Sequence, residues 1–460
     1  MHIRKYDVDY GRRHFMSTAA QGAVAAGVLA PLWPLIANGA DLGKAYPDEH
    51  MSVDMYTKGK IKTGDYVTAA NVDAVKDLLD PITYKQVKTM GRKIKIVPTV
   101  TDATKLYPMG FLEASLKNKG KAKFDANGNI VEAATGKPWI GGLPFADAKN
   151  ANEAIANLTL SWGRHDYCQY AIRQWDIAPD GSQAYQYDFV WAELQAQARI
   201  DGTVFQNKND LLRLQSVWFT APQDTSGSSF LSTWYYDQRK FPDLYGYLPA
   251  FRRVRQFPTN QRFEPLLPGI TWFLSDAWAA GDPMLTWGNY KIVGRQPMLG
   301  AVSENWHGSK KNWELPVHGG PKGQTFFDTN FSMCPECIVL EAEPTGYPRA
   351  PVGKKRVWID VRNQQFVAYI TFDRRGEMWK SFEPGWSRYQ DGSAVVKDSK
   401  GNSEWSWAYV LSHDIQANRM SRIMHTESTS GGYKSQLSTN GVDVYNKYLT
   451  NQAIQRLGTA

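Results

Sequence analysis

Two of the three cysteines, Cys334 and Cys337, enclose a Cys-Pro-Glu-Cys sequence that could carry redox or metal chemistry. A redox-active pair usually opens a helix, where the thiol pKa is lowered, but this pair directly precedes an apolar strand pattern that begins at Ile338. A structural zinc site needs four ligands, and the chain contains no second pair of cysteines. We therefore expect a local disulfide between Cys334 and Cys337 and a buried thiol at Cys168, with redox and metal roles as the alternatives.

Three arginines within four residues, Arg252, Arg253 and Arg255, accompany an aromatic strand pattern. Their guanidinium groups could bind an anionic head group through charge-assisted hydrogen bonds. They could also form a solvated strand face or pair with acids across a sheet, and this structural interpretation is favoured. We keep Arg253 as the candidate ligand contact.

The sequence holds no pattern that specifies a reaction. The histidines beyond residue 39 are far apart and show neither His-x-His nor His-x-x-x-His spacing. The Gly-x-Ser-x-Gly of hydrolases, a phosphate-binding loop and a Gly-x-Gly-x-x-Gly after a strand are all absent from the sequence. We expect no catalytic residue, no metal site and no cofactor.

Aromatic residues are unusually frequent: 17 Trp, 23 Tyr and 19 Phe make up 13% of the chain. Such residues suit the half-buried surface of a β-sheet, and they also line apolar ligand pockets. The net charge of +8 is spread along the sequence instead of forming a basic stripe, which argues against nucleic-acid binding. The composition favours a β-rich globular protein with a large apolar core.

The second half of the chain has the pattern of short strands joined by tight turns. The clearest part is 355–382, where three apolar runs separated by turns at 362–364 and 373–376 predict an antiparallel meander. No helical pattern alternates regularly with the strands, so a parallel α/β sheet is not expected. Further strands are expected at 185–200, 212–219, 230–236, 245–254, 289–293 and 338–342.

Helical spacing is confined to a few places. Val72, Val75 and Leu78 lie at helical intervals after Thr68, and Pro81 predicts where that helix stops. The other local elements that we expect are helices at about 148–170 and 442–457 and a hairpin with an Asn-Gly turn at 125–129.

The first 39 residues have the features of a twin-arginine signal peptide. Arg12 and Arg13 precede Phe15 and a weakly apolar run, rich in Ala and Gly, that extends from Thr18 to Ala37. Small residues at 37–40 offer a cleavage site, so we expect export of the folded protein to the periplasm. A membrane anchor is the alternative, and the two prolines within the run argue against it.

The remainder of the chain divides into two parts. Residues 40–182 are expected to form an N-terminal extension of helices and long loops. Residues 183–460 are expected to form a β-sheet domain, packed with the N-terminal part as one unit.

Several blocks resemble those of a proteobacterial domain-of-unknown-function family labelled outer-membrane lipoprotein-sorting protein. Tyr247–Arg255 resembles that family's Tyr-Leu-Pro-Ala-Leu-Arg-Arg-Val-Arg-Arg block. Lys355–Asp360 and Asp373–Lys380 are similar to two later blocks. Gly142–Phe145 is similar to an earlier Gly-x-Pro-Phe-Pro block, with Ala146 in place of the last proline. The blocks follow the family's order over most of the mature chain.

This resemblance implies a mainly β (α+β) fold similar to the LolA and LolB lipoprotein carriers. Such a fold is a strongly curved antiparallel sheet that forms an unclosed barrel, with helices across its concave side. Family members are frequently encoded near RND-type transporters, which implies a periplasmic role in moving an apolar compound. The family has no established catalytic residues, so none is carried over.

We therefore expect a periplasmic carrier or binding protein for a lipid or other hydrophobic compound, serving an RND-type transporter or outer-membrane sorting. The alternatives are a periplasmic hydrolase or oxidoreductase for a hydrophobic substrate and a non-catalytic docking scaffold for an envelope transporter. Which face of each strand lines the cavity stays open, because a shift of one residue turns every side chain to the other face. The candidate ligand contacts are Trp234, Tyr236, Tyr247, Arg253, Trp358, Tyr369 and Trp379.

Overall fold

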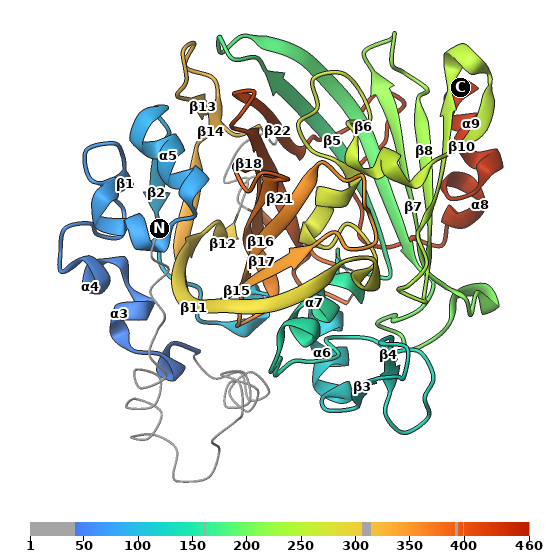
Figure 1. The fold of residues 1–460 in the computed structure, drawn as a ribbon, viewed down its shortest axis with the longest axis horizontal. Coiled ribbons are helices and arrows are strands. Elements are labelled where there is room, and N and C mark those ends of the chain that lie inside the picture. The colour runs from blue at the N-terminus through green and yellow to red at the C-terminus, as the bar shows by residue number, and fades with distance from the viewer. Residues whose placement is uncertain (1–41, 161, 306–313, 392–393, 399, 460) are drawn as a thin grey trace.

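The computed structural model describes residues 42–459 except 161, 306–313, 392–393 and 399, and one large β-sheet dominates it (Figure 1). The expected signal peptide lies outside the described residues. The sheet contains 16 strands in the described part of the chain, and its neighbouring strands are antiparallel apart from β2 with β15 and β12 with β18. The strands along its main path are, in order, β1 (Tyr66–Val67), β2 (Ile94–Ile96), β15 (Thr329–Glu343), β16 (Val352–Asp360), β17 (Gln365–Asp373), β18 (Met378–Arg388), β21 (Trp405–Asp414), β22 (Arg419–His425), β5 (Tyr167–Ile177), β6 (Gln183–Gln195), β7 (Leu211–Ala221), β8 (Ser229–Tyr235), β9 (Asp243–Leu248) and β10 (Arg253–Phe257). The strands off this path are β11 (Gly288–Gly300), beside β15, and β12 (Val302–Asn305), beside β18.

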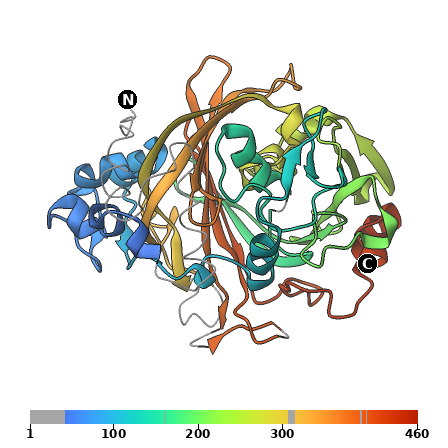
Figure 2. The ribbon, with the colours of Figure 1, turned by 90° about the horizontal axis from the view of Figure 1, so that it is seen from below.

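The sheet curves strongly and does not close into a barrel (Figure 2). Within the described residues β10 pairs only with β9, and β11 pairs only with β15, so an open seam separates these two edge strands. Strand twist accumulates across a sheet of this size and curls it. The expected fold class, a mainly β chain with a curved, unclosed antiparallel sheet, is therefore confirmed.

Short helices and turns occupy the concave side of the sheet (Figure 2). The end of α7 meets the sheet there, because the carbonyl of Leu160 accepts a hydrogen bond from Gln195 of β6, 2.6 Å away. The chain between β10 and β11, residues 258–287, also runs through the concave side, and we call it the crossing segment. Its helical turns are η6 (Thr259–Phe263), η7 (Leu274–Ala279) and η8 (Met284–Thr286).

The outer face of the sheet is covered by both ends of the described chain (Figure 1). On the N-terminal side, Arg92 forms a buried ion pair with Glu383 of β18 at 2.7 Å. On the C-terminal side, Tyr448 stacks on Trp218 of β7 with ring centroids 5.0 Å apart. The helices of the described chain, none of them long and apolar enough to cross a membrane, are α3 (Asp48–Met51), α4 (Val53–Thr57), α5 (Pro81–Thr89), α6 (Met109–Asn118), α7 (Ala151–Leu160), α8 (Val444–Tyr448) and α9 (Asn451–Thr459). The remaining elements are the turns η1 (Leu42–Ala45), η2 (Val72–Leu78), η3 (Ala103–Lys105), η4 (Phe205–Asn207) and η5 (Pro249–Phe251), and the strand pairs β3 (Ala122–Phe124) with β4 (Ile130–Glu132), β13 (Val317–His318) with β14 (Phe326–Phe327) and β19 (Gln390–Asp391) with β20 (Ala394–Val395).

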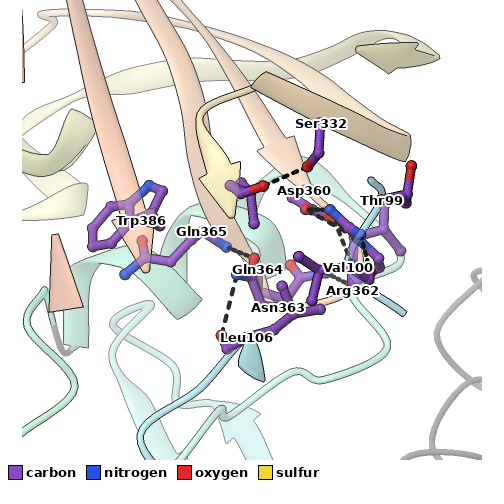
Figure 3. A network of polar contacts seen from close by, with 12 residues as sticks. Thr99, Val100, Leu106, Ser332, Asp360, Arg362, Asn363, Gln364, Gln365 and Trp386 are labelled. Carbon is purple, nitrogen blue, oxygen red and sulfur yellow. Dashed lines mark hydrogen bonds and ion pairs between the residues drawn. The ribbon is translucent and has the colours of Figure 1, made fainter. Parts of the chain in front are cut away.

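The turn between β16 and β17 is fully buried, although turns normally lie at the surface (Figure 3). The guanidinium of Arg362 donates three hydrogen bonds to the Asp360 carboxylate, the shortest of 2.6 Å, and one to the carbonyl of Val100 at 2.6 Å. The Tyr107 hydroxyl donates to the Arg362 carbonyl at 2.8 Å. The N-terminal region thus seals this end of the sheet through polar contacts that are strong because water is excluded.

The strand predictions hold best where turns are short. The meander at 355–382 is confirmed as β16, β17 and β18, and the hairpin around 125–129 is confirmed as β3 and β4. The single strand expected at 245–254 was wrong. It is a hairpin, β9 and β10, because Pro249 starts a tight turn and Arg252 closes it in the left-handed conformation (φ 49°).

The helix predictions were less accurate. The helix expected at about 148–170 ends at Leu160, and the chain then enters β5, which pairs with both β6 and β22. Pro81 starts α5 instead of ending the preceding helix, since Asp80 caps the first turn and proline suits that position. The helix expected at 442–457 is two short helices, α8 and α9.

Removal of the Asp360 carboxylate should show how much the buried turn contributes to stability. We expect Asp360→Ala to lower the free energy of unfolding by about 3–5 kcal/mol, because it leaves Arg362 charged and buried without its partner. Urea denaturation followed by circular dichroism measures this change. Asp73→Ala, which removes one partner of an exposed ion pair, should change stability far less. Equal effects of the two substitutions would contradict the structural role given to the turn.

Candidate functional site

A cavity of about 390 Å³ lies beside the open seam of the sheet. One wall is the start of the crossing segment, and the other is the loop that joins β15 to β16. We call this cavity the seam pocket. Its lining residues are Phe241, Thr259, Asn260, Phe263, Glu264, Gly346, Tyr347, Pro348, Arg349, Ala350 and Pro351.

Aromatic rings form the floor of the seam pocket. Tyr347 meets Phe263 edge-on, with ring centroids 4.9 Å apart, and it meets Phe241 in the same way at 5.1 Å. Phe241 is 38% exposed, which is high for a large apolar side chain. An apolar wall of this kind can remove ligand surface from water without many polar anchors.

A buried ion pair lies behind the aromatic floor. Arg262 contacts the Asp282 carboxylate at 2.6 Å, and both side chains are almost fully buried. The indole N–H of Trp287 donates to the same carboxylate at 3.0 Å. Because both charged residues belong to the crossing segment, this pair fixes the shape of the segment behind the pocket.

The rim of the seam pocket is polar. Arg349 is exposed and takes part in no ion pair among the residues that the structure describes. Glu264 and Asn260 are also exposed, on the opposite wall. The arrangement suits a ligand with an apolar body and one polar or anionic end.

Buried charges hold the crossing segment against the concave face. Asp276 accepts hydrogen bonds from Lys380 of β18 at 3.0 Å and from the Tyr369 hydroxyl of β17 at 3.2 Å. Lys355 of β16 donates to the carbonyl of Ala279 at 2.8 Å. Burial lowers the pKa of Lys355 to about 8, against the opposing effect of nearby carboxylates.

A second polar network anchors the same segment further along the sheet. The Thr271 hydroxyl lies 3.1 Å from that of Ser421, whose hydroxyl donates to Asp176. Trp272 donates to Gln174 at 2.9 Å. Burial raises the pKa of Asp176 to about 7, although hydrogen bonds from Ser421 and Gln174 lower it.

The concave side is therefore filled by the protein's own side chains. Trp278 of the crossing segment contacts three concave-side tryptophans and Phe382, with ring centroids 5.4–6.3 Å apart. Among the described residues no group of three or more His, Cys, Asp or Glu side chains is placed to hold a metal ion. The seam pocket is open space at the margin of the concave side.

The sequence-predicted ligand contacts do not gather in one cavity. Trp234 and Tyr369 face the concave side, where Trp234 packs against Trp162 at 5.0 Å and Tyr369 contacts the crossing segment. Tyr236 donates to the carbonyl of Ile130 at 2.6 Å and accepts from the Trp139 amide.

Of the other four, Trp379 also contacts the crossing segment, with its ring centroid 5.8 Å from that of Phe273. Tyr247 contacts the α9 region on the outer face. Val357 pairs with Tyr369 and shares its concave face, so the next residue, Trp358, points to the opposite face. Trp379 donates to Asp414 at 3.0 Å, and Arg253 is exposed on β10. None of the seven lines the seam pocket, and ligand contact by them stays a prediction.

Sequence reasoning missed the residues that line the seam pocket. The loop at 344–351 holds three prolines around Tyr347, and the turn at 259–263 follows a strand directly. Prolines flanking an aromatic residue between two strands are the one signal that could have marked the loop. Nothing in the sequence showed that these two segments, more than 80 residues apart, would face one another.

A second cavity, of about 410 Å³, lies on the outer face beside α8. It is lined by strand residues Tyr167 and Leu194, by Phe205 and by the chain at 439–445. Asp166 and Arg199 at its side lie 3.6 Å apart and so offset one another's charge.

The cysteines are buried thiols in the structure. Cys334 and Cys337 both lie on β15. Burial raises the pKa of Cys337 well above its usual value, so a reactive thiolate is disfavoured. Their disulfide stays a prediction, and Cys168 is buried.

Asp176→Asn tests the anchoring network through its pH dependence. The folded-state pKa of Asp176 is about 7 and the unfolded value is 3.8, so the folded protein binds more protons between these values. The stability contributed by this group is fully present below the unfolded value and is lost as pH rises to 7. We expect the wild-type protein to lose about 3 kcal/mol more than Asp176→Asn between about pH 5 and about pH 8.

Unfolding free energies from urea titrations at the two pH values give this difference. Asp180→Asn, in the exposed turn that follows β5, is the matched control for the loss of one carboxylate. Parallel pH profiles for the wild-type protein and Asp176→Asn would show that Asp176 is ionised in both states.

Alkylation under denaturing conditions tests the disulfide. For protein purified without reductant from an oxidising compartment, we expect one modified thiol, Cys168, and a mass two hydrogens below the reduced value. Modification of all three cysteines would contradict the pairing of Cys334 with Cys337.

Comparison with known proteins shows the family of this chain. No curated protein matches it. Among solved structures, an outer-membrane lipoprotein-sorting protein domain from Vibrio parahaemolyticus is similar, with 15% identity and a TM-score of 0.40. The match covers 64% of this chain and 93% of that one. A DUF1329 family protein from Desulfovibrio piger is similar with 12% identity and a TM-score of 0.41, over 64% of this chain and 94% of that one. A LolA superfamily protein from Nitrosomonas europaea is also similar, with 14% identity and a TM-score of 0.37, over 66% of this chain and 98% of that one. The family model for proteins of unknown function DUF1329 matches residues 66–455, and the chain therefore belongs to that family.

Proposed function

We propose that this protein is a carrier or binding protein for a lipid or another hydrophobic compound, held in the seam pocket. The observation that carries the proposal is an aromatic cavity of about 390 Å³ at the open margin of a curved sheet. Cavities of this size are typical of small-molecule sites. The names of the similar lipoprotein-sorting and LolA superfamily structures agree with a ligand of this class.

The lining defines the chemistry of the ligand. Phe263, Tyr347 and Pro348 offer an apolar surface, and Arg349 at the rim offers a cation to an acidic or phosphorylated end. Burying roughly 200 Å² of ligand surface there would contribute about 5 kcal/mol at 25 cal/mol per Å². That contribution supports reversible binding, as a carrier requires.

The filled concave side sets a limit on the ligand. In the conformation described, the crossing segment occupies the space that an open half-barrel would offer, and buried ion pairs hold it there. The bound part of the ligand is therefore about the size of one acyl chain segment or one small ring system.

We further propose that the protein works in the periplasm after export by the twin-arginine pathway. Its ligand would come from, or pass to, an RND-type transporter or the outer-membrane sorting route. The leader pattern at 10–16 and the neighbourhood of related genes implied by the resemblance support this placement.

Thr259→Trp should block the seam pocket. Thr259 is half-buried at the rim, and an indole there fills the space against Tyr347. With a fluorescent fatty acid as the probe, we expect at least about tenfold weaker binding, because the lost apolar contact is worth more than 1.4 kcal/mol. Thr439→Trp is the matched control, since Thr439 is half-buried at the second cavity.

Fluorescence titration of both variants gives the result, and circular dichroism checks their folding. Binding that is weakened by Thr439→Trp and unchanged by Thr259→Trp would move the site to the outer face. Absence of binding in the wild-type protein to fatty acids, sterols and lipopeptides would overturn the carrier proposal.

A further inference from the structure

The hairpin of β9 and β10 presents an apolar tip with cations directly behind it. Phe251 at the tip is 50% exposed. Arg252, Arg253 and Arg255 are all exposed, and the guanidinium of Arg255 lies 4.2 Å from the centre of the Phe251 ring. The Arg255 guanidinium lies over one face of this ring, and half of the Phe251 side chain stays exposed to solvent.

The tip is rigidly built. Pro249 fixes the first residue of the turn, and the amide of Arg252 donates to the carbonyls of Leu248 and Pro249, each at 3.2 Å. Behind the turn, Phe257 packs on Phe230 of β8 with ring centroids 6.1 Å apart. The body of the hairpin is therefore fixed to the sheet, and only its tip projects.

Arg252 adopts the left-handed conformation, with φ 49°. Glycine is the usual residue in this conformation, since a side chain there costs free energy. The chain accepts that cost and places a cation beside Phe251. Residue 252 is therefore an arginine at a backbone position where glycine would be more stable.

The hairpin of β9 and β10 carries positive charge that no nearby acidic residue in the sequence offsets. No acidic residue occurs between Asp243 and Glu264, and among the described residues none of the three arginines takes part in an ion pair. The lysines at 58, 60 and 62, near exposed Met55, offer the same number of cations. Asp54 and Asp65 flank these lysines at distances of three or four residues and offset part of their charge.

From these observations we infer that the hairpin of β9 and β10 docks on an anionic lipid surface, with Phe251 among the acyl chains and the arginines at the lipid phosphates. The order of groups matches a bilayer, where apolar chains lie deeper than the phosphate layer. Each arginine near an anionic membrane adds about fivefold to binding.

The docked hairpin would bring the seam pocket close to the lipid. Thr259 of the pocket follows Phe257, the last residue of β10, by two residues. Eight residues separate Phe251 from Thr259, and at about 3.3 Å per extended residue the pocket lies within about 27 Å of the tip. Docking does not depend on ligand binding in the pocket, and it extends the proposed function by giving the site access to membrane lipid.

Sedimentation with vesicles tests the inference. We expect the protein to bind vesicles of phosphatidylcholine mixed with phosphatidylglycerol, and to bind pure phosphatidylcholine weakly. Changing Arg252, Arg253 and Arg255 together to Ser should weaken binding about a hundredfold. The matched control changes Lys58, Lys60 and Lys62 to Ser, which removes the same charge and should leave binding unchanged.

The apolar tip has its own pair of variants. Phe251→Ser should weaken binding to the anionic vesicles, whereas Met55→Ser should not, although Met55 is 52% exposed. Arg252→Gly relieves the left-handed strain, so it should keep or raise stability while it weakens vesicle binding. An environment-sensitive dye attached to Phe251→Cys should shift to shorter wavelength on vesicles, and the same dye at Met55→Cys should not.

Two results would overturn the inference. The first is that the wild-type protein stays in the supernatant with anionic vesicles. Binding to an acidic polypeptide without binding to these vesicles counts as the same result. The other is equal vesicle binding by the arginine and lysine triple variants. Thr259→Trp should bind vesicles normally, so a failed ligand site and a failed docking surface give different results.

Discussion

An open curved sheet must cover its hollow face, and in this protein one segment of the chain does so. The crossing segment leaves one edge strand, passes through the concave side and joins the other edge strand. Apolar packing around Trp278 fills the space, and buried charge pairs, chiefly Asp276 with Lys380, set where the segment lies. Buried charges gain little stability over apolar contacts, but they penalise any other arrangement of the segment. The seam pocket lies between the start of this segment and the β15–β16 loop, and contacts of Phe263 and Thr286 with Tyr347 hold the two walls together.

The fold was predictable because its signals are local or follow from the resemblance. Alternation of apolar and polar residues at 355–382 depends on neighbours a few residues apart, and it correctly gave the meander. Errors arose where the tertiary fold overrides local preference. The helix ends at Leu160, Arg164 then adopts the left-handed conformation, and pairing with β6 and β22 makes the following residues a strand.

The site was much less predictable. Aromatic residues were taken as ligand contacts because they are numerous and lie on strands, yet Trp234 and Tyr369 contact other parts of the same protein. A sequence pattern shows that a side chain will be buried, but it does not show what buries it. The seam pocket depends on the approach of two segments that are far apart in the chain, and such an approach is decided by the whole sheet.

The central pairing of the sheet joins residues that are far apart in the chain. Strand β5 lies beside β22, and Ile177 pairs with Met420, about 240 residues later. During synthesis β5 and β6 can pair at once, but the two halves of the sheet can join only when nearly all of the polypeptide has left the ribosome. Until then one edge of β5 is unpaired, which favours association with other chains. The sheet can therefore be completed only after β22, the last of its strands in the chain, has been synthesised.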